Sequence, residues 1–261
     1  MPGTTRTNSL ALLPLLALAG CQSGEPSIAT TRDSAAVAWH DSVMAAMGGF
    51  DGWKNARYLH FRWNVIQNGQ VVSDRIHDWD RRSGKYRLRT TTRDGDSLLA
   101  LLNVNDRKGR VWVAGRPAEA SQNDSLVERA YAMFINDSYW LLMPYKWEDP
   151  GVNLEYVGPK TDGTGAWEVV HLTFENVGLT PGDQYWAYIS ETAPHLMRKW
   201  QYHLQNQPEA GPMIRWENWQ QFGPIKLATE RNPIGAPFRI VFKEIEVSRG
   251  VSAGVFEEPG G

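Results

Sequence analysis

The stretch LHFRWNVIQNGQVVSDRIHDWD, residues 59 to 80, decides the fold of this chain. Its first seven residues alternate apolar and polar side chains, the pattern of a β-strand with one buried face. Leu59, Phe61, Trp63 and Val65 share the apolar face. Asn68-Gly69 follows, a dipeptide that favours the tight turn of a β-hairpin, and residues 71–80 return. The stretch therefore predicts two antiparallel strands.

The same kind of pattern continues through most of the chain. Turns at 83–84, 94–95 and 108–109 extend the hairpin into a meander of five strands, and seven further strand-like segments lie between residues 152 and 247. Two regions have helical spacing instead. Residues 34–47 predict one helix that ends at Gly48-Gly49, and residues 121–142 predict one or two helices.

About twelve strands in one chain constrain the architecture, because open sheets rarely exceed about ten strands without curling or splitting. No change of composition marks a second domain, so residues 34–261 are expected to form a single domain. A mainly β (α+β) fold follows: an unclosed, strongly curved antiparallel β-barrel of about 11–12 strands. The N-terminal helix and a helical lid or plug would cover its concave, apolar face.

The first residues indicate where the protein resides. The apolar run at 10–20 is too short to span a bilayer, and Leu18-Ala19-Gly20-Cys21 resembles the lipobox of bacterial lipoproteins. In that family a peptidase cuts before the cysteine, which is then acylated. The resemblance implies a signal peptide at 1–20, lipidated Cys21 and a tether at 21–33. Gln22 points to the outer membrane, facing the periplasm. The alternative is an ordinary secretory peptide with a chance cysteine.

Composition excludes several classes of function. Cys21 is the only cysteine, which excludes disulfides, thiol catalysis and thiolate metal sites. Lys and Arg total 27 and Asp and Glu 29, so the balance of charge is not that of a nucleic-acid-binding protein. The 12 tryptophans predict an extensive aromatic surface, and leave open whether that surface is core or binding site.

The best candidate for chemistry is His77-Asp78-Trp79-Asp80. On an extended strand His77 and Trp79 lie on one face and the two carboxylates on the other, so a His–Asp general base would need help from another strand. The simpler interpretation is that Asp80 accepts hydrogen bonds in the turn toward Gly84, with Arg81 or Arg87 nearby. None of the six histidines has the spacing of metal ligands. We therefore expect no catalytic residue, no metal and no cofactor.

One charge stands out among apolar positions. In residues 196–204, strand alternation places Arg198 on the face of Trp200 and Tyr202. An unpaired charge there would be costly, so Arg198 is expected either to pair with a carboxylate at the sheet rim or to contact the head group of an anionic amphiphile.

The run YWLLMPYKW at residues 139–147 is the most aromatic part of the chain. Pro144 should end the helix and leave Tyr145 and Trp147 on irregular backbone. The run could be ordinary core, a surface for a partner, or a lid over an apolar concavity. We call residues 139–147 the lid segment.

Two further motifs carry a family resemblance. HDWDRRSGKYR (77–87) and SYWLLMPYK (138–146), together with the strand–helix–strand order, the lipobox and the closing VFEEP (255–259), resemble an uncharacterised branch of the LolA/LolB-like superfamily of lipoprotein carriers. That resemblance covers most of residues 36–258. It implies an unclosed β-barrel capped by helices.

Two functions are compatible with these observations. The first is an outer-membrane lipoprotein, not an enzyme, that binds or carries an acyl chain, a lipid or a lipoprotein. The second is a structural or assembly lipoprotein whose cavity is filled by its own helices. For the first, the predicted ligand-binding residues are Leu59, Phe61, Trp63, Trp140, Leu142, Trp147, Arg198, Trp200 and Tyr202.

The lipobox yields a direct prediction. We expect Cys21→Ala to abolish acylation and to remove the protein from the outer-membrane fraction, because two or three acyl chains give stable anchoring and a tether without them gives none. Membrane fractionation with mass spectrometry of the N-terminal peptide measures both effects. An unmodified Cys21 in the wild-type protein, or a variant that stays in the membrane fraction, would contradict the lipoprotein assignment.

Overall fold

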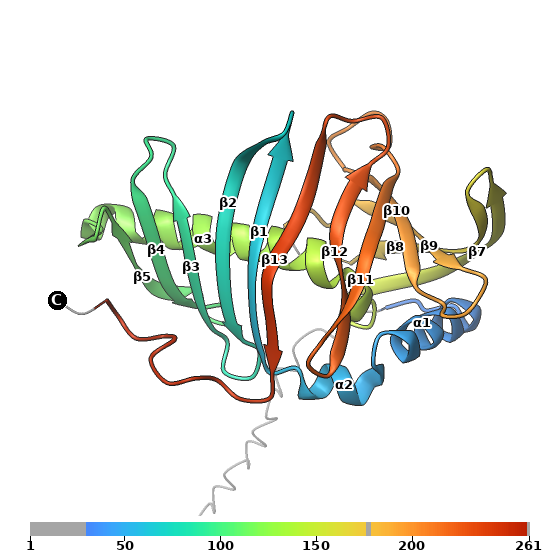
Figure 1. The fold of residues 1–261 in the computed structure, drawn as a ribbon, viewed down its shortest axis with the longest axis horizontal. Coiled ribbons are helices and arrows are strands. Elements are labelled where there is room, and N and C mark those ends of the chain that lie inside the picture. The colour runs from blue at the N-terminus through green and yellow to red at the C-terminus, as the bar shows by residue number, and fades with distance from the viewer. Residues whose placement is uncertain (1–29, 176–178, 260–261) are drawn as a thin grey trace, which may run out of the picture.

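The strands form one continuous antiparallel sheet, seen in the computed structural model, which describes residues 30–175 and 179–259 (Figure 1). The predicted signal peptide and Cys21 lie outside the described residues. Thirteen strands are present: β1 (Tyr58–Gln67), β2 (Gln70–Asp80), β3 (Lys85–Thr91), β4 (Ser97–Asn103), β5 (Lys108–Val113), β6 (Arg116–Pro117), β7 (Val152–Asp162), β8 (Gly165–Phe174), β9 (Gln184–Ser190), β10 (Met197–His203), β11 (Ile214–Phe222), β12 (Ile225–Pro233) and β13 (Phe238–Ser248).

The order of the strands follows from two meanders that share a central seam. It runs β6-β5-β4-β3-β2-β1-β13-β12-β11-β10-β9-β8-β7, so the last strand pairs with the first. The edge strands β6 and β7 do not pair with each other, and the sheet stays open. The predicted fold class is thereby confirmed. The strand beyond the expected twelve is β6, which has only two residues.

The connection from β6 to β7 has to cross the whole sheet, because these consecutive strands are its two edges. Helix α3 (Ala120–Leu142) makes that crossing, and its 23 residues correspond to about 35 Å. Figure 1 shows it running across the sheet behind the strands. It is a single helix, where the sequence left one or two open. Among the described residues, no helix is long and apolar enough to cross a membrane.

The prediction for the N-terminal helical region was wrong in one respect. The region contains two helices, whereas the sequence predicted one. Helix α1 (Ser34–Ala46) begins after Asp33, whose carboxylate accepts a hydrogen bond from Ala35 N, and α2 (Gly49–Asn55) follows. Gly48 joins them with φ +114°, and an added Cβ would meet Pro224 O at 2.5 Å. The glycine therefore lets the chain turn closely over the sheet and continue as a helix.

Two hydrophobic clusters fill the concave side of the sheet. The larger contains residues of α1, the lid segment and the strands from β1 through β13 to β7, whereas the smaller packs the first half of α3 against β3, β4 and β5. Residues 31–33, assigned to the tether from sequence, run beside β7: Asp33 N donates to Leu154 O, and Leu154 N donates to Thr31 O.

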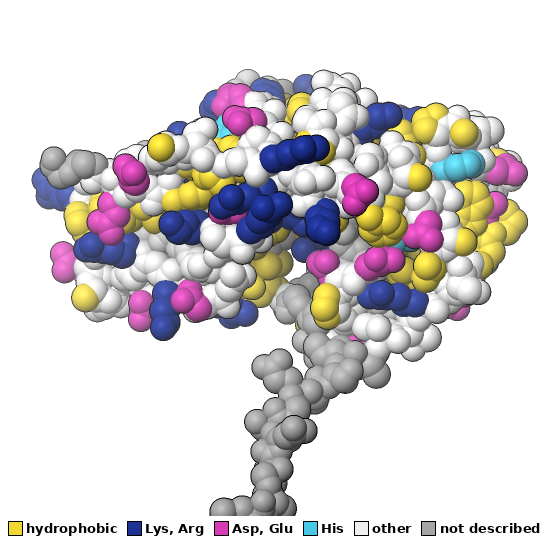
Figure 2. All heavy atoms as spheres, turned by 90° about the horizontal axis from the view of Figure 1, so that it is seen from below, with side chains coloured by type: hydrophobic (Ala, Val, Ile, Leu, Met, Phe, Trp, Pro, Cys, Tyr) yellow, Lys and Arg dark blue, Asp and Glu magenta, His cyan; other side chains and the backbone are white. Residues whose placement is uncertain are grey.

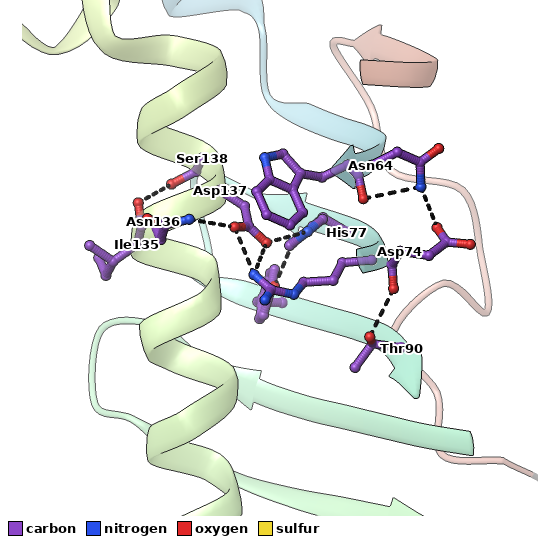
Figure 3. Close-up of polar contacts among 11 residues, drawn as sticks. Asn64, Asp74, His77, Thr90, Ile135, Asn136, Asp137 and Ser138 are labelled. Atoms are coloured by element: carbon purple, nitrogen blue, oxygen red, sulfur yellow. Dashed lines mark hydrogen bonds and ion pairs between the residues drawn. The ribbon is translucent and has the colours of Figure 1, made fainter. Parts of the chain in front are cut away.

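A buried polar network fixes the middle of α3 to strand β2 (Figure 3). Arg75 Nη1 donates to both carboxylate oxygens of Asp137, at 2.9 and 3.0 Å. His77 Nε2 lies 3.1 Å from Asp137 Oδ2, off the line of a hydrogen bond. On its other side, His77 Nδ1 lies 2.7 Å from the hydroxyl of Tyr86, and the imidazole stacks on Phe61. The carboxylate beside His77 thus comes from helix α3 and not from another strand. His77 and Asp137 are fully buried, whereas Arg75 is partly exposed.

The C-terminal end of α3 is held by a fully buried cation, Arg231. Arg231 on β12 has no exposed surface, and its Nε donates to Trp140 O at 2.9 Å. Nη1 donates to Ala228 O and Glu230 O, both at 3.0 Å, and the guanidinium lies 3.4 Å from the ring centre of Trp216. Burial lowers the pKa of Arg231. No described carboxylate pairs with it, so the negative end of the helix dipole supplies the compensating charge.

The turn after β2 confirms the structural interpretation of Asp80. Its carboxylate accepts hydrogen bonds from Arg82 N and Ser83 Oγ. Its cationic partner, however, is Arg57, the residue directly before β1, and the guanidinium lowers the pKa of Asp80 well below the ordinary value. Arg81 instead donates to two carbonyls at the end of α2, those of Trp53 and Ala56.

Helix α2 and the start of β1 lie at the lower side of the molecule in Figure 1. Figure 2 looks onto that side and shows Lys and Arg side chains gathered over its middle, with hydrophobic and acidic side chains around them. The face is therefore mixed in character, as the nearly balanced charge of the whole chain suggests.

The capping role of Arg231 can be tested by substitution. We expect Arg231→Met to lower the free energy of unfolding by about 3 kcal/mol, because each buried carbonyl left without a donor costs about 1–3 kcal/mol. Arg239→Met is the matched control, since Arg239 lies on the adjacent strand with its side chain 51% exposed. Urea denaturation measures both. Equal effects of the two substitutions would show that the contacts to α3 contribute nothing.

Candidate functional site

The lid segment is divided between core and cavity. Leu141, Leu142 and Met143 are at most 1% exposed and Trp147 is fully buried, whereas Tyr139 and Trp140 are only partly buried. Most of the segment is therefore core. Its first two residues are the part that faces open space.

The backbone of the lid segment is more regular than the sequence indicated. After α3 ends at Leu142, a 3-10 turn η1 (Met143–Lys146) continues it, with Pro144 in its first turn, where a missing N–H costs nothing. Tyr145 lies in this turn, and its hydroxyl is 2.7 Å from Lys226 O and 2.9 Å from Met47 O. Tyr145 thus lies on 3-10 backbone, and the expectation of irregular backbone was wrong for this residue. Buried Trp147 follows η1 in a turn.

A cavity of about 530 Å³ lies beneath the second half of α3. One wall is α3 itself, the opposite wall comes from β8, β9 and β10, and residues of segment 146–152 close one side. Seven aromatic side chains dominate the lining: Phe134, Tyr139, Trp140, Phe174, Tyr185, Trp200 and Tyr202. The cavity occupies the part of the concavity that the main core does not fill.

The aromatic rings contact one another as well as the cavity. Trp140 meets Trp200 edge-on at 4.9 Å between ring centroids, and Tyr185 lies 4.9 Å from Trp200 on the other side. Tyr139 and Phe174 continue the wall, at 5.6 and 5.1 Å from Tyr185. Interlocked rings of this kind hold their shape without a ligand, which favours a preformed apolar pocket.

The mouth of the cavity combines exposed leucines with charges that are already paired. Leu179 and Leu204 line it and are 50% and 37% exposed. Lys146 Nζ lies 2.8 Å from the carboxylate of Asp149, and buried Asp183 accepts hydrogen bonds from Thr180 Oγ1 and Gln205 N. An entering ligand would meet apolar surface first.

Some polar atoms in the lining remain available. The indole N–H of Trp200 is buried and has no hydrogen-bond partner among the described residues. Burial raises the pKa of Tyr139 and of Tyr202, so both hydroxyls stay protonated at neutral pH. These groups can donate to a carbonyl or hydroxyl oxygen of a ligand.

The structure separates the nine predicted ligand-binding residues. Trp140, Trp200 and Tyr202 come together on the cavity wall. Five others do not line the cavity and are at most 5% exposed in the main core: Leu59, Phe61, Trp63, Leu142 and Trp147. They belong to the filled part of the same concavity.

Arg198 occupies a different place from the one that strand alternation implies. A bulge in β10 shifts the register between Met197, which pairs with Ile189, and Lys199, which pairs with Tyr188. Arg198 is the extra residue, is half-buried, does not line the cavity and makes no ion pair with a described carboxylate. The buried, paired cation is its neighbour Lys199, whose Nζ lies 2.5 Å from Asp162 Oδ2.

Several cavity residues were missed from the sequence. Phe174, Leu179, Asp183 and Tyr185 come from β8, β9 and the segment between them. Alternation in residues 184–190 already places Tyr185 on one face with Ala187 and Ile189. The sequence of a single strand does not reveal which of its faces is concave. Alternation therefore could not show that Tyr185 faces the cavity.

Comparison with known proteins concerns the whole fold. No family profile and no curated protein matches this chain. Among solved structures it is similar to a DUF1329 family protein from Desulfovibrio piger, at 10% identity, covering 85% of this chain and 97% of that one, with a TM-score of 0.47. A lipoprotein-sorting protein domain from Vibrio parahaemolyticus matches at 8% identity over 79% and 93% of the two chains, with a TM-score of 0.44.

A third similar structure is the Mycobacterium tuberculosis lipoprotein LppX, at 11% identity over 84% of this chain and 98% of that one, with a TM-score of 0.33. A lipoprotein-sorting domain and a lipoprotein stand among the solved structures that this chain is similar to. The likeness concerns the fold alone.

Proposed function

We propose that the protein is a lipoprotein that binds or carries an acyl chain, of a lipid or of another lipoprotein, in the cavity beneath α3. Acylated Cys21 would hold it at the outer membrane, facing the periplasm. The observation that carries the proposal is the aromatic cavity of about 530 Å³ with leucines at its mouth. Cavities of this size and lining are typical of sites for small apolar ligands.

The chemistry of the cavity favours a chain over an ionic ligand. Each methylene group that leaves water for the aromatic wall contributes about 0.8 kcal/mol. The charges of Lys146, Asp149 and Asp183 are satisfied by their neighbours. The indole N–H of Trp200, which has no partner among the described residues, can donate a hydrogen bond to the carbonyl oxygen of an ester or an acid.

The proposed site is preformed, because the elements around it are anchored elsewhere. Arg231 and Tyr145 tie the end of α3 and η1 to β12 and to the end of α1. Opening the lid segment would break these buried hydrogen bonds and expose Trp147. Ligand entry past Leu179 and Leu204 requires none of this.

A binding role is preferred to a catalytic one. The pair formed by His77 and Asp137 is fully buried, and neither residue lines the cavity. The alternative, a structural or assembly lipoprotein with a self-filled concavity, is favoured by one observation: Leu142, Met143 and Trp147 fill the centre of the concave face. Ligand binding at the remaining cavity distinguishes the two.

The test uses two neighbouring lid residues with different surroundings. We expect the wild-type protein to bind a fluorescent fatty acid saturably and palmitate to displace it. Trp140→Ala should weaken binding about tenfold, because an aromatic side chain contributes roughly 1.5–3 kcal/mol of apolar contact. Leu142→Ala should leave affinity unchanged and lower the free energy of unfolding by about 2–5 kcal/mol.

Displacement titrations and thermal unfolding measure the two effects separately. Absence of saturable binding to the wild-type protein would support the self-filled alternative. Equal losses of affinity in both variants would show that the ligand does not occupy the cavity under Trp140.

A further inference from the structure

A second cluster of functional groups lies outside the cavity, where α1 meets the end of the lid segment. His40 on α1 is 1% exposed, and its imidazole stacks on Trp147 at 5.3 Å between ring centroids. Its Nε2 lies 3.1 Å from Pro144 O. A carbonyl oxygen only accepts hydrogen bonds, so Nε2 carries the proton and the lone pair of neutral His40 is on Nδ1.

That lone pair has no hydrogen-bond partner in the part of the chain that the structure describes. Nδ1 of His40 is buried and unsatisfied, and it lies 3.5 Å from Glu148 Oε1. The carboxylate of Asp41 completes the group, with all three ligand atoms within 4.8 Å of one another. Arg32 donates to the main-chain carbonyls of Glu148 and Asp149 and leaves the Glu148 carboxylate free. A buried nitrogen therefore faces two carboxylates that are open to solvent.

We propose that His40, Asp41 and Glu148 bind a divalent transition-metal ion of the zinc class. One imidazole nitrogen and two carboxylate oxygens form a ligand set that Zn²⁺ accepts, with water in the fourth position. The separation of Nδ1 and Oε1 is close to the roughly 3.4 Å between two ligands of a tetrahedral ion at about 2.0–2.2 Å. Asp41 reaches the ion by a change of side-chain rotamer, because it is exposed.

The surroundings of His40 are those of a metal ligand. A ligating histidine donates its second ring N–H to a carbonyl or carboxylate, which fixes the tautomer and the ring orientation. Pro144 O performs that role here, and the ring of Trp147 holds the imidazole in place.

An ion at this position would connect two parts of the protein. His40 and Asp41 belong to α1, and Glu148 follows the 3-10 turn that ends the lid segment. Lys146 and Asp149, on either side of Glu148, line the cavity. The metal would therefore brace one wall of the cavity against α1. The site stands on its own geometry and does not depend on the proposed ligand.

Calorimetric titration of the metal-free protein with Zn²⁺ tests the site. We expect one ion per chain, with affinity reduced at least about tenfold in Glu148→Gln and in Asp41→Asn, a reduction on the scale found for changes around metal sites. Both side chains are exposed, so both variants should fold. Co²⁺ added in place of Zn²⁺ should give a visible absorption band that Glu148→Gln removes.

The matched control is a second His–Glu pair on the sheet. His171 Nδ1 lies 3.2 Å from Glu155 and its Nε2 lies 3.0 Å from Gln184, but no third described histidine or carboxylate completes this pair as Asp41 does beside His40. Glu155→Gln should leave Zn²⁺ affinity unchanged. No stoichiometric binding to the wild-type protein would overturn the site. So would binding that survives Glu148→Gln and Asp41→Asn, or that falls equally in Glu155→Gln.

Discussion

The crossing of α3 over the concave face is the constraint on which the rest of the structure depends. Two meanders meet where β1 pairs with β13, so the chain between them has to pass from one edge of the sheet to the other. A helix does this economically, because its backbone groups bond to one another along the way. Only its polar side chains and the carbonyls of its last turn need hydrogen-bond donors from elsewhere. Arg75 donates to the carboxylate of Asp137, and Arg231 donates to the carbonyl of Trp140 near the end of the helix. Charges so deeply buried persist only when they are paired or capped.

These contacts decide where the concavity is full and where it stays open. Near the centre, the end of α3 and η1 are held tightly against β12 and α1, and Leu142, Met143 and Trp147 fill the space. Farther along, toward β8, β9 and β10, aromatic side chains form a wall around empty volume. One aromatic segment thus serves as core through some residues and as cavity wall through others.

The many tryptophans have a second use beyond apolar burial. Arg81 stacks on Trp53 at 3.2 Å, Arg231 on Trp216 at 3.4 Å, and Lys199 lies 4.0 Å from the ring centre of Trp167. An aromatic face attracts a cation, and the attraction is stronger where water is excluded. It therefore helps to stabilise charged side chains in the interior of the fold. Arg81 and Arg231 each use this shelter to cap a helix, since both donate to carbonyls at a helix end.

The sequence by itself determined the local elements. Alternation and the Asn68-Gly69 turn predicted the hairpin of residues 59–80, and the count of such segments predicted a curved open sheet, because these patterns reflect contacts between near neighbours. The tertiary structure alone decided the rest. Asp137 and Arg75 are 62 residues apart, His40 and Pro144 are 104 apart, and one bulged residue moved Arg198 out of the face that alternation assigned to it. Strand alternation defines two faces without saying which is concave. The residues that share a cavity or a buried pair are chosen by strand order and curvature, which depend on the whole chain.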